Sequence, residues 1–270
     1  MIETLHLFEE LGIGLRELLS SLTPDEWRRP TVHRDRDVKD LASHLLDTAQ
    51  RRLASQRDGW FGDEKPRSLD WDGLVELIQH RNRGWMDVTR RLSPRQLVDQ
   101  LARTDAELVD LLRTLAPHDR ALYPVAWAGE EVSENWFDVA REYTERWHHQ
   151  QQIRDALGRP GFTEPRFQTP VIATFLRGAP HAYRDVDAPI GAAVAIDVDD
   201  THVTVVRGAA SWTLGARDQV KPAATISLAG ADAWRLWTKG LAAAEARARA
   251  TTAGPEALVA PMFAYVAIMA

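Results

Sequence analysis

Apolar residues recur at three- and four-residue spacing through the first half of the chain, which is the pattern of amphipathic helices. In residues 3–22 the stripe consists of Leu5, Phe8, Leu11 or Gly12, Leu15, Leu18, Leu19 and Leu22. The pattern predicts further helices over residues 37–57, 71–92, 93–117 and 133–158. Asp37 is a candidate N-cap, Ser93-Pro94 has the composition of a helix start, and Gly158 is a candidate C-terminal cap. Residues 58–69 have the composition of a loop.

Beyond Gly158 the proline and glycine content rises, and the pattern then changes from helical to alternating. A helix is predicted near residues 171–183, and strands at 193–198, 203–207, 211–214 and 224–228. Asp199-Asp200 is the expected turn between the first two strands, and helices follow at 231–240, 242–250 and 259–268. Grouped strands followed by grouped helices indicate an α+β domain. We therefore expect a two-domain α+β protein: a four-helix bundle at 1–160, and a smaller domain at 165–270 with a mostly antiparallel sheet.

The amino-acid composition argues against several classes of function. The formal net charge is −6 over 270 residues, which argues against a general nucleic-acid binder because basic residues are not in excess. The chain has no cysteine, so a thiol reaction would need a thiol from outside. Neither a secretory signal nor an apolar run of membrane-spanning length is evident, which predicts a cytoplasmic protein that does not bind membranes.

The candidate chemistry lies on the predicted helix 133–158. Glu145 and His149 are four residues apart, so their side chains leave the same face of a helix and can reach one metal ion. A catalytic divalent site needs a third protein ligand and an open position. We assign the third ligand to His44, at the edge of the apolar stripe of helix 37–57.

A structural interpretation competes with this assignment. Asp138, Glu142, Glu145, His149 and Gln152 share one helix face, opposite Trp136, Ala140, Tyr143 and Trp147, so the polar face would by itself be expected in water. His44 would then be a half-buried histidine bonded to a neighbour. No other catalytic motif competes: the chain has no phosphate-binding glycine loop, and Ser211 has no nucleophile-elbow signature.

Two motifs together resemble a known family. The segment TERWHHQQQIRDALG at 144–158, and Asp-Val-x-Asp-Leu-x-x-His-Leu at 37–45, resemble the mycothiol-dependent maleylpyruvate isomerase family. ADAWRLWTKG at 231–240 and the closing AIMA resemble its carboxy-terminal domain. The resemblance implies a DinB-like four-helix bundle in which His44, Glu145 and His149 hold a divalent metal, with the polar stripe lining the bundle interior.

Neighbouring residues have simpler expected roles. His148 lies about 100° around the helix from His149, so both cannot easily bind the same ion, and a surface or supporting position is expected for it. Gln150, Gln151 and Gln152 could position a ligand, or they could be exposed glutamines.

The resemblance also implies a reaction. Zinc, with nickel as the alternative, would hold mycothiol or a similar low-molecular-weight thiol, which would attack a small electrophilic substrate in a transferase or isomerase reaction. Arg207 or Arg235 would supply a cation for an anionic ligand. The alternatives are a non-catalytic bundle that binds a metal or small ligand, and a metal-dependent hydrolase. A homodimer is compatible with such a bundle.

Overall fold

The chain, described by a computed structural model over residues 1–62, 71–215 and 221–268, divides into two compact units. We call residues 3–122 and 142–162 the helical unit, and residues 1–2, 123–141 and 163–268 the sheet unit. Helix α5 (Asn135–Leu157) therefore begins in the sheet unit and ends in the helical unit. The domain limits 1–160 and 165–270 stay a prediction.

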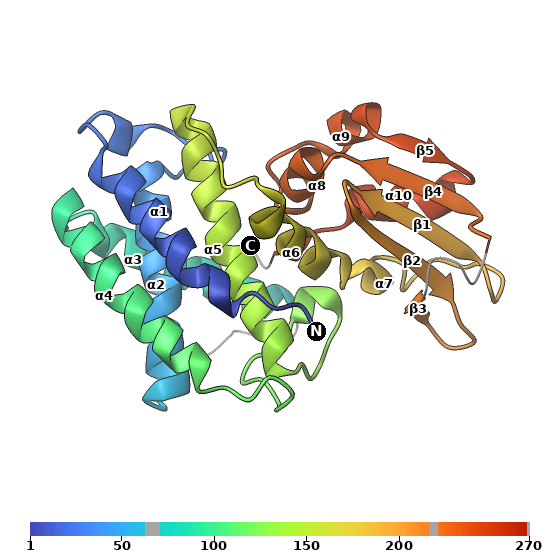
Figure 1. Ribbon diagram of the computed structural model, residues 1–270, viewed down its shortest axis with the longest axis horizontal. Helices are drawn as coiled ribbons and strands as arrows, with labels where there is room; N and C mark the ends of the chain where they lie inside the picture. The colour runs from blue at the N-terminus through green and yellow to red at the C-terminus, as the bar shows by residue number, and fades with distance from the viewer. Residues whose placement is uncertain (63–70, 216–220, 269–270) are drawn as a thin grey trace. The chain divides into compact units, whose positions relative to one another are not determined.

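The helices of the first half follow the predicted order (Figure 1). They are α1 (Phe8–Ser20), α2 (Val38–Arg52), α3 (Trp71–Thr89), α4 (Pro94–Arg113) and α5. A π-helical turn, Leu53–Arg57, extends α2, and short 3-10 turns occur at Leu5–Leu7, Glu26–Arg28 and Ala126–Ala128. Of the loop predicted at 58–69, residues 63–69 lie outside the described residues.

The expected helix ends are present. The carboxylate of Asp37 accepts the backbone N–H of Asp40 at 2.8 Å, and the Asp40 carboxylate accepts the N–H of Asp37 at 3.3 Å, which makes a capping box. Ser93 caps α4, with Pro94 at its first position. At Gly158 the backbone has φ +63°, the left-handed conformation in which glycine ends a helix without a steric cost.

The core of the helical unit comes mainly from α1, α2, α4 and α5. Each of its large side chains stabilises the fold by about 1.5–3 kcal/mol through burial. Helix α3 packs on α2, where the indole N–H of Trp85 donates to the carbonyl of Ser43 at 2.9 Å. The buried cluster consists of Leu15, Leu18, Leu19, Trp27, Val38, Leu41, Ala42, Leu45, Leu46, Leu97, Leu101 and Ile153. The predicted bundle is thus confirmed, and α3, which was predicted at 71–92, packs beside α2.

The sheet unit contains a five-stranded mixed sheet in the order β3-β2-β1-β4-β5 (Figure 1). Its strands are β1 (Ala193–Val198), β2 (Thr201–Arg207), β3 (Trp212–Gly215), β4 (Ala224–Leu228) and β5 (Thr251–Ala253). The pairs β1–β2, β2–β3 and β4–β5 are antiparallel, as predicted, whereas β1–β4 is parallel. Strand β5 was not predicted, because three residues are too few to show an alternating pattern.

Among the described residues of the sheet unit, the helices that follow α5 are α6 (Pro165–Leu176), α7 (Ala179–Ala182), α8 (Gly230–Trp237), α9 (Ala243–Arg249) and α10 (Glu256–Ala264). Trp127 packs edge-on against Phe137 and Phe175, and Trp237 packs against Phe175 and Tyr265. Such aromatic contacts add to the stabilisation from burial. The closing AIMA ends at residues 269–270, which lie outside the described residues.

Candidate metal centre

Helix α5 is buried on both of its faces, so the expectation that its polar face lies in water is wrong. Glu142 is 3% exposed and His149 is 5% exposed, while Tyr143 and Trp147 on the opposite face are fully buried. Partners on other helices make this burial tolerable. Glu142 pairs with Arg52 of α2 at 3.5 Å, and Arg146 donates to Asp105 of α4 at 2.8 Å. The polar stripe of α5 therefore lines the interior of the helical unit.

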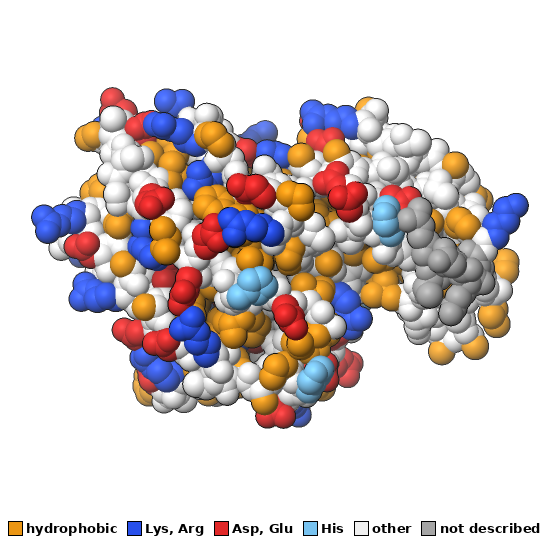
Figure 2. Space-filling model, viewed as in Figure 1, with side chains coloured by type: hydrophobic (Ala, Val, Ile, Leu, Met, Phe, Trp, Pro, Cys, Tyr) orange, Lys and Arg blue, Asp and Glu red, His pale blue; other side chains and the backbone are white. Residues whose placement is uncertain are grey.

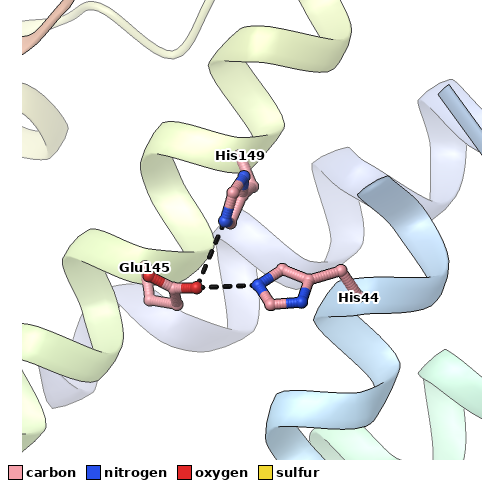
Figure 3. A group of neighbouring side chains, drawn as sticks. All are labelled: His44, Glu145 and His149. Carbon is pink, nitrogen blue, oxygen red and sulfur yellow. Dashed lines mark hydrogen bonds and ion pairs between the residues drawn. The ribbon is translucent and has the colours of Figure 1, made fainter. Parts of the chain in front are cut away.

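His44, Glu145 and His149 come together inside this unit, from α2 and from successive turns of α5 (Figure 3). Nε2 of His44 lies 3.0 Å from Oε1 of Glu145, and Nε2 of His149 lies 3.2 Å from the same oxygen. One ligand atom from each residue lies within 4.8 Å of the other two. In a tetrahedral zinc site, ligand atoms bound at about 2.0–2.1 Å are separated by about 3.3 Å, so small side-chain movements would close this set on an ion.

The ionisation states of two of these groups suit metal binding. Burial, which disfavours the imidazolium form, lowers the pKa of His44 to about 4, so the ring is neutral at pH 7. Burial alone would raise the pKa of Glu145, but the charge of His149 and the hydrogen bonds from both rings hold it well below its usual value. At neutral pH, His44 is thus an uncharged imidazole and Glu145 a carboxylate, the forms in which these side chains bind a metal ion.

The hydrogen bonds of His149 are those expected behind a metal ligand. Its Nδ1 lies 2.8 Å from Oε1 of Gln152, so an Nδ1–H donor fits this contact and leaves Nε2 with a lone pair. Its Nε2 also faces an oxygen, that of Glu145, and a neutral ring cannot donate to both. A cation between His149 Nε2 and Glu145 would satisfy both atoms without a second proton.

His148 was expected either at the surface or in a supporting position beside the site. The structure excludes the surface position. It is 1% exposed, and its Nδ1 lies 2.8 Å from the carbonyl oxygen of Thr144. Its ring packs against that of His149, with centroids 4.0 Å apart. His148 is absent from the converging set of ligand atoms, which agrees with the separation of the two rings around the helix.

Two residues near the metal centre, His33 and Gln152, were not assigned to it from the sequence. His33 lies in the loop before α2, and its Nε2 is 3.3 Å from Oε1 of Gln152. No local pattern links residues 119 positions apart, so nothing in the sequence pattern identified His33. Gln152, 3% exposed, lies three residues after His149 and hence on the same helix face, which was a usable signal. Gln150 and Gln151 are buried too.

The two arginines suggested as anion-binding groups lie in the sheet unit. Arg207 ends β2, and Arg235 lies on α8, where its guanidinium stacks over Trp234 with its carbon 4.4 Å from the ring centroid. Both are half-buried. Their assignment to a ligand stays a prediction.

The buried histidines predict a pH dependence of stability. Burial, followed by the charge of His149, lowers the pKa of His148 to about 3. Since an unfolded histidine titrates at about 6.5, the unfolded state binds more protons below that pH, and acid destabilises the fold by about 1.4 kcal/mol per pH unit for each such group. In urea titrations of the metal-free protein, we expect His148→Gln to lose less stability than the wild type between pH 6.5 and 5.5, by about 1 kcal/mol. Equal losses would show that His148 is protonated in the fold.

Over the helical unit, acidic and basic side chains are interspersed on the face shown in Figure 2. Among the residues described, none of the helices has the length and apolar character needed to cross a membrane.

Comparisons with known proteins agree with the fold. Two crystal structures of mycothiol-dependent maleylpyruvate isomerase, one of them a mutant, are similar to this chain at 14% identity. The mutant structure has a TM-score of 0.54, with 92% of this chain and 91% of that chain covered. The other has a TM-score of 0.51, with 88% of each chain covered. No match was found among curated protein sequences.

A sequence comparison addresses the family directly. The family model described as mycothiol maleylpyruvate isomerase N-terminal domain matches residues 8–154, which is more than half of the 270 residues. The matched segment includes His44, Glu145 and His149. The chain therefore belongs to the mycothiol maleylpyruvate isomerase family.

Proposed function

We propose that this protein is a metal-dependent enzyme that uses mycothiol or a similar small thiol to transform a small electrophilic substrate. His44, Glu145 and His149 would hold a divalent ion, with zinc as the first expectation and nickel as the alternative. The observation that carries the proposal is the contact of two imidazole nitrogens with one carboxylate oxygen, at 3.0 and 3.2 Å, in a buried setting. Two imidazoles and a carboxylate are a ligand set of catalytic zinc sites, which keep a further position open.

The chain has no cysteine, so the nucleophilic thiol must come from solution. A divalent ion held here would lower the pKa of a bound thiol or polarise a substrate carbonyl. In the isomerase reaction, the thiolate adds to one carbon of a conjugated double bond, and the π electrons move onto the carbonyl. Rotation about the resulting single bond and expulsion of the thiolate then restore the double bond in the other geometry. Helix α5 and α2 contribute by holding the ligands in place and excluding water.

Metal analysis combined with a thiol-dependence assay tests this function. The purified full-length protein should contain about one equivalent of divalent metal, and isomerisation of maleylpyruvate followed by absorbance should require both that metal and mycothiol. Bound metal without thiol-dependent turnover would favour a metal-dependent hydrolase or a metal-binding bundle. Turnover that persists after complete removal of the metal would contradict the proposal.

Gln152 provides a finer test of the metal centre. Its carbonyl oxygen accepts from His149 Nδ1, and the loss of such a supporting contact typically weakens metal binding by about 10–100-fold. We expect that weakening in Gln152→Leu, measured by competition with a chromophoric chelator. Gln152→Glu keeps an acceptor oxygen at this position and should bind metal at least as tightly as the wild type. Equal metal affinity in the leucine variant would show that Gln152 does not orient the ligand.

A further inference from the structure

Arg36 is a buried cation that none of the described carboxylates pairs with. It precedes the capping residue of α2 and is 9% exposed. Its Nη2 donates to the amide oxygen of Gln79 on α3 at 3.2 Å, and its Nε has no hydrogen-bond partner. Among the residues that the structure describes, no acidic side chain forms an ion pair with it.

The other buried arginines of the helical unit differ from Arg36 in this respect. Arg52 pairs with Glu142 at 3.5 Å, and Arg146 pairs with Asp105 at 2.8 Å. Removing a charged group from water is costly unless an opposite charge compensates for it. A guanidinium held by one neutral amide is therefore incompletely satisfied, and an anion from outside the protein would supply what the fold does not.

The position of Arg36 connects it with the metal centre. Its backbone N–H donates to the carbonyl of His33 at 3.2 Å, so the two residues belong to one tight loop. The ring of His33 contacts Gln152, which in turn contacts His149. Burial, followed by the charges of His149 and Arg36, lowers the pKa of His33 to about 4, as expected when both charged groups lie near this ring.

A second unsatisfied donor, the amide nitrogen of Gln152, belongs to a side chain that is hydrogen-bonded to His33 of the same loop. The Gln152 side chain is 3% exposed, and its oxygen accepts from His149 and His33, while its amide nitrogen has no hydrogen-bond partner. Buried amide groups are nearly always hydrogen-bonded, so this nitrogen also requires an acceptor. Arg36 and Gln152 thus both present unmet donors, and both contact His33.

We propose that Arg36, supported by the amide of Gln152, binds a carboxylate of the ligand that occupies the metal centre. A carboxylate fits because one guanidinium matches its single charge and its two oxygens can accept from the planar fork. This inference rests on the proposed function and extends it, since it assigns the recognition of an acidic ligand to the helical unit. The carboxylate can belong to the thiol or to the electrophilic acid that the thiol attacks.

The experiment compares the wild type with Arg36→Gln and uses three probes on the full-length, Co²⁺-loaded protein. 3-Mercaptopropionate carries a thiol and a carboxylate, 2-mercaptoethanol carries the thiol alone, and maleate carries carboxylates alone. Thiol binding is followed through the thiolate-to-cobalt absorption, and maleate binding by calorimetry. Arg95→Gln on α4 is the matched control, because that side chain is 92% exposed and the change in net charge is the same.

The expected result is a selective loss in Arg36→Gln. Binding of 3-mercaptopropionate should weaken by about 10–100-fold if the thiol supplies the carboxylate, as should binding of maleate if the substrate supplies it. Binding of 2-mercaptoethanol should not change, and Arg95→Gln should match the wild type throughout. Unchanged binding of all three probes, or equal weakening of 2-mercaptoethanol, would overturn the inference.

Two readouts separate this inference from folding and from the metal. Removing an unpaired buried charge should leave the Tm of Arg36→Gln equal to or above that of the wild type, whereas a structural arginine would lower it. Arg36→Lys should show an intermediate loss of carboxylate binding, because it keeps the charge without the fork. If the protein binds no metal, the proposed function fails, but maleate should still raise the Tm of the metal-free wild type more than that of Arg36→Gln. No difference in that comparison would refute the carboxylate site itself.

Discussion

Replacement of His149 by alanine is expected to abolish stoichiometric metal binding and to reduce thiol-dependent turnover by more than about 100-fold. The magnitude follows because even residues that only support a metal ligand typically contribute about 10–100-fold to affinity or activity. Nε2 of His149 is one of the two imidazole nitrogens on Glu145 Oε1, and its removal leaves only two protein ligands. Elemental analysis of the purified variant measures the first effect, and an assay at saturating mycothiol measures the second.

The same loss is expected for His44→Ala, because that ring completes the set from a different helix. His80→Ala is the matched control: His80 is an exposed histidine of α3, and its removal should leave metal content and turnover unchanged. A His149→Ala protein that retains a full equivalent of metal would place the ion elsewhere in the chain.

Asp105→Ala is expected to destabilise the protein by about 3–5 kcal/mol, the usual cost of breaking a buried ion pair by removing one partner. Asp105 is 7% exposed and accepts from Arg146 at 2.8 Å and from Arg16 at 3.3 Å. Arg146 is itself 6% exposed, and another of its guanidinium nitrogens, Nη2, has no partner. The variant would leave Arg146 its longer ion pair with Glu142, at 3.7 Å, but remove the contact at 2.8 Å, which urea denaturation at pH 7 would detect as a lower midpoint.

A double variant distinguishes the lost charge from lost packing. Asp105→Leu combined with Arg146→Met removes both charges and fills the space with apolar atoms, so its stability should be close to or above that of the wild type. The exposed pair of Arg113 and Glu9, 2.6 Å apart, is the control, and Glu9→Ala should cost less than about 1 kcal/mol. A double variant as unstable as Asp105→Ala would indicate that packing at this position matters more than charge.

Local signals were sufficient to predict most of the helices and strands. Asp37 and Ser93 mark helix starts because their side chains accept backbone N–H groups within the first turn. Gly158 marks a helix end because it adopts the left-handed conformation. Strand β4 was predicted at its observed limits, since its inward residues alternate with exposed ones. The spacing of Glu145 and His149 likewise required nothing beyond helical geometry.

Long-range contacts explain what the sequence could not provide. The polar face of α5 has the pattern of a solvent-exposed surface, and it is buried only because Arg52 and Asp105, on two other helices, pair with Glu142 and Arg146. His33 reaches Gln152 from a loop whose conformation no local pattern encodes. The unpaired charge of Arg36 is visible only once its neighbours in space are known.

The continuity of α5 constrains how this architecture can be modified. The division between the helical unit and the sheet unit falls between Arg141 and Glu142, in the middle of an unbroken helix. Genetic recombination that swaps whole modules usually succeeds where crossovers fall in exposed linkers. A crossover at residue 141 would instead join two half-helices from different parents, so hybrids between family members should tolerate exchange of loop sequences far better than exchange of entire units.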